Sequence, residues 1–240
     1  YSNVLSLCKK MGVTLLDIPI TDISDMTLDK VNHSRESRDT CYENIQARAR
    51  TYMLMTVANK YNGIVVGTGD LSEIALGWST YNGDHISMYN VNSGVPKTLV
   101  KFLVSWASKN EYSGEISKIL DEIVKQPISP ELLPPVGSVI AQKTEDIIGP
   151  YELHDFFLYY FVRYRFDAKK VLFLAQKSFS GKYNDEEIKK VLKIFIKRFF
   201  QNQWKRDCVP AGVKVGSVDL SPRGSWRMPA DADSSGFLDF

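Results

Sequence analysis

Apolar residues recur at helical spacing along most of this chain. Between residues 42 and 61 they stand every four positions, which is typical of a long amphipathic helix, and Asn62-Gly63 then provides a stop. Similar patterns predict further helices over 2–10, 96–109, 114–125, 151–166, 168–179 and 185–207. The chain should therefore be largely helical.

Two short apolar segments, residues 13–20 and 64–66, have the character of buried strands instead. Each follows a predicted helix, and strands separated by a helix are typical of a parallel sheet. Residues 214–220 are also strand-like. Two buried strands are too few for a complete α/β domain, so we expect further sequence to precede Tyr1.

A glycine-rich turn, residues 67–69, follows the second strand and leads into a helix that starts at Asp70. Ligands of open α/β sheets bind beyond the carboxyl ends of the strands, where this turn lies. Asp70 and Glu73 would repel a bare phosphate, but they suit a phosphate that brings Mg²⁺ with it. The same pair also has the spacing of a capping box, so the pattern leaves both interpretations open.

Composition limits the classes of partner. The 30 basic and 28 acidic residues give a net charge of +2, too small for the basic surface of a nucleic-acid or membrane partner. Three widely spaced cysteines without a CxxC pair favour a reduced, cytoplasmic compartment and predict no zinc site. No apolar run approaches the length that spans a bilayer.

Polar and aromatic residues gather at several further places. Asn44 and Arg48 stand four residues apart on one helix face, where a guanidinium would match a carboxylate or a phosphate. Residues 78–85 mix aromatic, hydroxyl and carboxylate side chains, which suits a pocket for a ring with polar substituents. Lys97 follows a proline at a helix start, and Lys205 stands near a helix end. Each feature also has an ordinary explanation in core packing or a solvated surface.

Eight sequence blocks resemble the synthetase domain of the glutamine-dependent NAD⁺ synthetase family. They occur in the family's order over nearly the whole chain, at residues 42–50, 67–73, 76–81, 83–84, 89–92, 95–99, 148–157 and 221–229. The resemblance implies an α/β fold with a Rossmann-like parallel sheet of the ATP-pyrophosphatase (adenine nucleotide alpha hydrolase-like) type. The sheet would be truncated at its N-terminus, and a helical appendage would follow at the C-terminus.

The resemblance also implies a division of the chain. Residues 1–150 would form the truncated domain that binds ATP and deamido-NAD⁺, including a proline-rich loop over 126–150. Residues 151–240 would form the helical segment and tail of the same synthetase domain.

The implied reaction activates a carboxylate. ATP, with Mg²⁺, adenylates the nicotinate carboxylate of deamido-NAD⁺ (nicotinic acid adenine dinucleotide), and glutamine-derived ammonia then displaces AMP to give NAD⁺. Such a site works by positioning its substrates and neutralising phosphate charge, and no catalytic residue is assigned. The resemblance further implies a cytoplasmic homo-oligomer.

Matching the family's motifs assigns residues to each ligand. ATP would contact Thr68, Lys97 and Ser129. Deamido-NAD⁺ would contact Asn44, Arg48, Glu73, Trp78, Ser79, Thr80, Tyr81, Asp84 and Lys205. Glu73 would also hold Mg²⁺, and Tyr81 favours the glutamine-using branch, because ammonia-only relatives tend to have lysine there.

Two parts of the family pattern do not occur in these 240 residues, the phosphate loop Ser-Gly-Gly-x-Asp-Ser and the glutaminase domain that supplies ammonia. We therefore expect a fragment that does not turn over by itself. Two alternatives remain: the synthetase domain of another ATP-pyrophosphatase amidotransferase such as GMP synthetase, or a non-catalytic assembly module built on the aromatic helix over 156–166.

Overall fold

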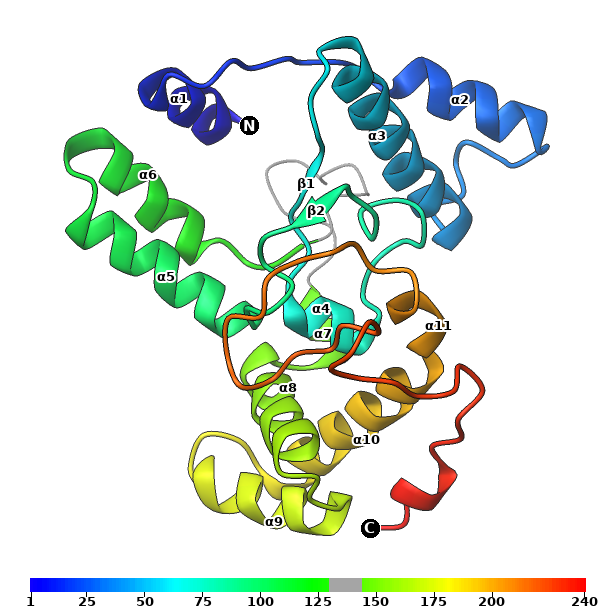
Figure 1. Ribbon diagram of the computed structural model, residues 1–240, viewed down its shortest axis with the longest axis vertical. Helices are drawn as coiled ribbons and strands as arrows, with labels where there is room; N and C mark the ends of the chain where they lie inside the picture. The colour runs from blue at the N-terminus through cyan, green and yellow to red at the C-terminus, as the bar shows by residue number, and fades with distance from the viewer. Residues whose placement is uncertain (130–143) are drawn as a thin grey trace.

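The computed structural model describes residues 1–129 and 144–240 of the chain (Figure 1). The longer helices are α1 (Ser2–Met11), α2 (Thr21–Lys30), α3 (Thr40–Lys60), α5 (Lys97–Asn110), α6 (Gly114–Lys125), α8 (Tyr151–Leu158), α9 (Ala168–Ser178) and α10 (Asp185–Gln201). Short helices are α4 (Leu71–Leu76), α7 (Thr144–Ile148), α11 (Gln203–Arg206), the π-helical turn η1 (Tyr159–Arg163) and the 3₁₀ turn η2 (Ser235–Phe237). Residues 130–143, which belong to the predicted proline-rich loop, lie outside the described residues. Among the described helices none is both long and apolar enough to cross a membrane.

The main hydrophobic core lies where α8, α9 and α10 pack together at one end of the molecule (Figure 1). The amphipathic pattern of α10 aims its apolar side inward, so Phe195 and Phe199 are fully buried. They meet Phe157 and Phe161 from the neighbouring helix and π-helical turn in tilted or edge-on ring contacts. The small helix α4 joins this core through Leu71 and Leu76. The core thus provides a rigid base for α4, which carries the acidic turn.

The described residues form one small sheet of two parallel strands, β1 (Val66–Gly67) and β2 (Tyr89–Asn90). Val66 pairs with Tyr89, and Gly67 pairs with Asn90. The parallel direction agrees with the prediction, but the partner strand was not predicted. Burial of the segment 64–66 is also wrong, because Ile64 and Val66 are 67% and 50% exposed.

The predicted strand over 13–20 does not form. No described segment pairs with these residues, and a lone extended chain cannot satisfy its backbone hydrogen bonds within a ladder. Val13, Leu16 and Ile18 are correspondingly exposed. Residues 214–220 form no strand either; nearby, Gly212 makes one isolated parallel bridge to Asn90. Apolar composition therefore did not reveal whether a partner strand lies beside these segments.

Two predicted helices are interrupted. The helix over 151–166 continues past α8 only as the π-helical turn η1, and the helix over 185–207 breaks at Asn202, between α10 and α11. The Asn202 side chain donates to the carbonyl oxygens of Leu76 and Arg198 at 3.2 and 2.8 Å. Asn202 also packs on Gly77, whose left-handed backbone (φ 58°) ends α4 and leaves no room for a Cβ atom. The break therefore fits α11 against the end of α4.

Candidate functional site

The acidic turn after β1 forms a complete capping box. The Asp70 carboxylate accepts a hydrogen bond from the Glu73 backbone N–H at 2.9 Å, and the Glu73 carboxylate accepts one from the Asp70 N–H at 3.1 Å. The local interpretation of this pair is therefore confirmed. The capping box uses only one oxygen of each carboxylate, so the second oxygen of each can bind another partner.

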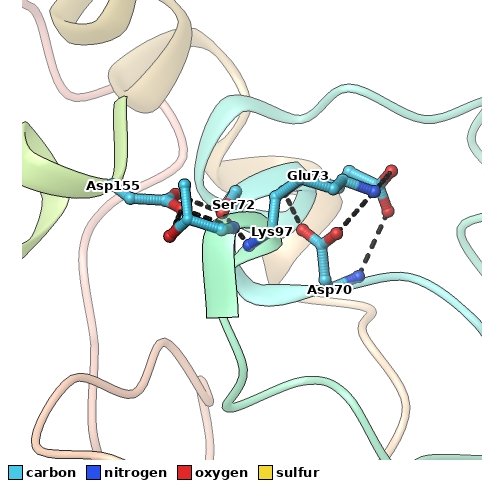
Figure 2. Close-up of polar contacts among 6 residues, drawn as sticks. Asp70, Ser72, Glu73, Lys97 and Asp155 are labelled. Atoms are coloured by element: carbon cyan, nitrogen blue, oxygen red, sulfur yellow. Dashed lines mark hydrogen bonds and ion pairs between the residues drawn. The ribbon is translucent and has the colours of Figure 1, made fainter. Parts of the chain in front are cut away.

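Lys97, the first residue of α5, supplies that partner (Figure 2). Its Nζ lies 2.6 Å from Asp70 Oδ2 and 2.7 Å from Glu73 Oε1. The Asp70 side chain is only 2% exposed, whereas those of Glu73 and Lys97 are 23% and 20% exposed. One ammonium thus faces two carboxylates, and the group keeps contact with solvent on the side of Glu73 and Lys97.

The charges of this triad shift one another. Burial, and then the neighbouring charge of Asp70, raise the pKa of Glu73 to about 7. Burial also raises the pKa of Asp70, although Lys97 opposes that shift. Burial disfavours the charged ammonium of Lys97, but the two carboxylates outweigh it and raise its pKa above the usual value. The triad therefore holds a proton on its carboxylates up to near neutral pH, unless a second cation replaces it.

Glu73 should make the stability of the chain depend on pH. Its folded-state pKa of about 7 lies above the ordinary 4.5, so the folded chain binds this proton more tightly than the unfolded chain. The resulting stabilisation is present at acidic pH and is lost as pH rises from about 4.5 to about 7. Glu73→Gln should remove this loss, which thermal unfolding across that range would measure. Parallel pH profiles for the two proteins would contradict the assignment.

Two adjoining cavities lie beside the acidic start of α4. The first has a volume of about 330 Å³ and the second about 520 Å³. Six residues line both, namely Glu73, Gly77, Ser79, Asp84, Ser129 and Lys205. Each cavity is within the size range usual for small-molecule sites, and the shared wall makes them two compartments of one site.

All twelve residues that the sequence assigned to ligands line these cavities. Thr68 and Lys97 line the first cavity alone. The second cavity alone is lined by Asn44, Arg48, Trp78, Thr80 and Tyr81. Both cavities are lined by Glu73, Ser79, Asp84, Ser129 and Lys205. The structure therefore brings the predicted residues together, while the ligand that each would contact remains a prediction.

Several of these side chains also build the wall of the second cavity. The Thr80 hydroxyl donates to Asn44 Oδ1 at 2.8 Å, and its backbone N–H donates to Asp84 Oδ1 at 2.8 Å. Arg48 Nε donates to the Tyr81 carbonyl oxygen at 3.2 Å. These bonds tie the start of α3 to the loop after α4, so the cavity shape is fixed by its own lining.

Lys205 holds the same loop from the other side. Its ammonium donates to the carbonyl oxygens of Gly77 and Ser79 at 2.9 and 2.8 Å. Burial, assisted by the charge of Arg198, lowers the pKa of Lys205. Its position near a helix end suggested only a contact with the dipole of its own helix, and the family resemblance assigned it to deamido-NAD⁺; the structure places its ammonium against the C-terminal end of α4.

Sequence reasoning missed several residues of the site. Arg50, which lies two residues from Arg48 on α3 and received no role, lines the first cavity, whereas Arg48 lines the second. His85, which received no role, also lines the first cavity and donates from Nε2 to the Lys205 carbonyl oxygen at 2.7 Å. Arg198 lines the second cavity with its guanidinium 4.8 Å from the centre of the Trp78 ring. Arg198 lies on α10, far along the chain from Trp78, so no local pattern could identify it.

Comparison with known proteins agrees with this geometry. Residues 1–208 match the family model described as NAD synthase. The chain is 41% identical to the glutamine-dependent NAD(+) synthetase of Mycobacterium leprae, over 99% of the chain and 38% of the relative. It is 31% identical to the Thermotoga maritima protein of the same name, over 93% of the chain and 35% of the relative. The chain thus spans little more than a third of the length of these curated relatives.

Solved structures show the same fold. A glutamine-dependent NAD(+) synthetase from Cytophaga hutchinsonii aligns with a TM-score of 0.77 at 21% identity, over 99% of this chain and 37% of that one. An NMN synthetase from Francisella tularensis aligns with a TM-score of 0.57 at 20% identity, over 85% of this chain and 69% of that one. An α/β fold shared with these structures accounts for the small parallel sheet between helices. With its family-model match over most of its length, the chain belongs to the NAD synthase family.

Proposed function

We propose that this chain forms the ATP- and deamido-NAD⁺-binding part of a glutamine-dependent NAD⁺ synthetase. One observation carries the proposal: the residues assigned to ATP and to deamido-NAD⁺ line two adjoining cavities that meet at Glu73. ATP would occupy the first cavity, beside Thr68 and Lys97. The nicotinate end of deamido-NAD⁺ would occupy the second, beside Trp78 and Tyr81.

The proposed reaction has two steps. An oxygen of the nicotinate carboxylate attacks the α-phosphorus of ATP, the bond to the bridging oxygen breaks, and pyrophosphate leaves. Ammonia then attacks the carbonyl carbon, the bond to the AMP oxygen breaks, and the nitrogen loses a proton to give the amide. The residues of the chain would hold the carboxylate and the α-phosphate in contact, which is the principal requirement for such a transfer.

The charges around the cavities suit anionic substrates. Arg50 and Lys97 line the first cavity, Arg48 and Arg198 line the second, and Lys205 lines both. Cationic side chains that face phosphate or carboxylate oxygens neutralise charge as it develops. The mixture of these cations with Glu73 and Asp84 provides for a polyphosphate accompanied by a divalent cation.

Mg²⁺ fits the donor set at the start of α4. Asp70 and Glu73 present carboxylate oxygens close together on one turn, and such oxygens together with phosphate are the ligands that Mg²⁺ prefers. When bound, Mg²⁺ would supply neutralisation of triphosphate charge. We propose that Glu73 is a ligand to it, and that Lys97 stays beside the two carboxylates, where its ammonium would also contact the phosphates.

Turnover would need more than these 240 residues, because they contain neither the Ser-Gly-Gly-x-Asp-Ser loop nor a glutaminase domain. We therefore propose that ammonia comes from a glutaminase domain outside this chain. Steady formation of NAD⁺ and AMP by the chain alone, given ATP, Mg²⁺, deamido-NAD⁺ and ammonium, would refute the expected lack of turnover.

Titration calorimetry tests the ligand assignment. The chain should bind deamido-NAD⁺ in preference to xanthosine monophosphate, and Trp78→Ala should weaken this binding about tenfold, because an aromatic wall of the second cavity is lost. Trp106→Ala is the matched control, since Trp106 is 46% exposed and lines neither cavity. Preference for xanthosine monophosphate would favour a GMP synthetase. Self-association without nucleotide binding would favour an assembly module.

A further inference from the structure

Asp155, on α8, connects α4 to α5 beside the proposed site (Figure 2). Its Oδ1 accepts a hydrogen bond from the Ser72 hydroxyl of α4. Its Oδ2 accepts two from Thr98 of α5, from the backbone N–H at 3.0 Å and from the hydroxyl at 2.6 Å. The Ser72 oxygen in turn accepts a bond from the Lys97 backbone N–H at 2.8 Å. One carboxylate therefore organises the first two residues of α5.

These bonds replace an ordinary helix cap. The first backbone N–H groups of a helix have no partner within it, and a side chain at the N-cap position usually accepts from them. Pro96 occupies that position in α5 and makes no side-chain cap bond. Ser72 and Asp155, from two other helices, accept from the N–H groups of Lys97 and Thr98 instead. The start of α5 is thus capped by the elements against which it packs.

Asp155 does this at an energetic cost. Burial disfavours its charged form and raises its pKa, so the carboxylate would not lie there without good partners. Three donors from two helices satisfy it, and its negative charge lies at the positive end of the α5 dipole. Asp155 lines neither cavity, so any effect on ligands must pass through its partners.

The partner that matters is Lys97. Its ammonium reaches Asp70 and Glu73 of α4 from the first position of α5, so its place depends on how the two helix starts are held together. Ser72 stands between those two carboxylate residues and bonds to the Lys97 backbone. We propose that Asp155 is a positioning residue that, through Thr98 and Ser72, keeps the Lys97 ammonium between the two carboxylates. The inference extends the proposed function and rests on it in one respect, namely that Lys97 contacts ATP.

Thr98→Val tests the proposal with a small change. This substitution removes the hydrogen bond from the Thr98 hydroxyl to Asp155, whereas Thr98→Ser should retain that bond. Ser108→Ala is the matched control, because Ser108 also lies on α5 and donates to a carboxylate, Asp121 Oδ1, at 2.7 Å. If Asp155 only docked helices, Thr98→Val and Ser108→Ala would lower stability and change nothing else.

The position of Lys97 can be read directly from its rate of reductive methylation, measured residue by residue by mass spectrometry. Thr98→Val should increase the rate at Lys97 severalfold and Asp155→Ala should increase it further, while Thr98→Ser and Ser108→Ala leave it unchanged. An unchanged rate in Thr98→Val and Asp155→Ala, or an equal increase in Ser108→Ala, would overturn the positioning role.

Calorimetry of Mg·ATP binding connects this role to the ligand. Thr98→Val alone should raise the dissociation constant for Mg·ATP about tenfold, as expected for loss of a hydrogen bond to a charged group. When Lys97 is already replaced by alanine, Thr98→Val should leave the dissociation constant unchanged. A further tenfold loss in the Lys97→Ala background would overturn the proposal, since Thr98 would then act independently of Lys97. If methylation responds as expected but the unmodified chain does not bind Mg·ATP, the positioning role stands and the proposed ATP site fails.

Discussion

Replacing Lys97 by methionine should lower the free energy of unfolding by about 3 kcal/mol at pH 8, because it leaves two carboxylates without their counter-ion in a largely buried place. Methionine keeps most of the side-chain volume, so the loss would report charge rather than packing. The same variant should weaken Mg·ATP binding about tenfold, since the proposed phosphate contact is gone. Urea unfolding and calorimetry on one preparation would measure both effects.

The pH dependence of this loss distinguishes an ion-pair role from general damage. Below about pH 5 the Glu73 carboxyl, with its pKa of about 7, is protonated in the folded chain and needs no counter-ion, so the loss should shrink. Asp70→Asn added to Lys97→Met should restore part of the stability at pH 8, because asparagine still caps α4 without charge. Lys101→Met, which changes an exposed lysine on the same helix, should have almost no effect. An equal loss at both pH values would contradict the assignment.

Local features of this region could be predicted from the sequence, and its long-range contacts could not. Asp70 and Glu73 are three residues apart, so spacing alone indicated the capping box that the structure contains. The third member of the triad, Lys97, comes from another helix and lies 24 residues from Glu73. Only the resemblance to a family placed Lys97 and Glu73 in one site, and even that gave no reason for their direct contact.

Strand pairing is likewise a long-range contact that the local sequence could not predict. An apolar segment with β-branched residues, such as residues 13–20, has the composition of a buried strand. Composition is a local property of the segment and contains no information about its neighbours. Whether it pairs depends on a neighbour with free backbone groups, and no described segment provides one for 13–20. The pairing of β1 with β2 was not predicted, because each strand contributes only two paired residues. Two residues are too few to produce a recognisable alternation of apolar and polar positions.

The C-terminal helices were predicted as helices, and the family resemblance assigned only Lys205 among their residues to the site. Arg206 lies 131 residues from Ala75, whose carbonyl oxygen accepts a bond from its Nη1 at 2.8 Å. The sequence explained cations there by the dipole of their own helix. In the structure Lys205 and Arg206 both meet carbonyl oxygens at the C-terminal end of α4, so they complement the dipole of a different helix.

Arg206→Met should lower the free energy of unfolding by about 3 kcal/mol or more, because a fully buried guanidinium leaves several acceptors unsatisfied when it is removed. Arg206 is 0% exposed and donates to the carbonyl oxygens of Ala75 and Phe199 and, at 3.0 Å, to Gln203 Oε1. Its guanidinium also lies 4.3 Å from the centre of the Phe199 ring. Methionine fills similar volume but donates no hydrogen bond. Urea unfolding would measure the loss.

Arg206→Met should also affect deamido-NAD⁺ affinity, because it changes how the end of α4 is held. Arg206 fixes the carbonyl end of α4, immediately before Gly77 and Trp78, so its loss should also weaken deamido-NAD⁺ binding in molecules that remain folded. Lys197→Met, which removes an exposed cation from α10, is the control and should change neither property. A loss of stability under about 1 kcal/mol, the range of ordinary surface substitutions, would contradict the role of Arg206 as the bond between α4 and the C-terminal helices. Loss of stability with unchanged nucleotide affinity would instead show that the position of Trp78 does not depend on Arg206.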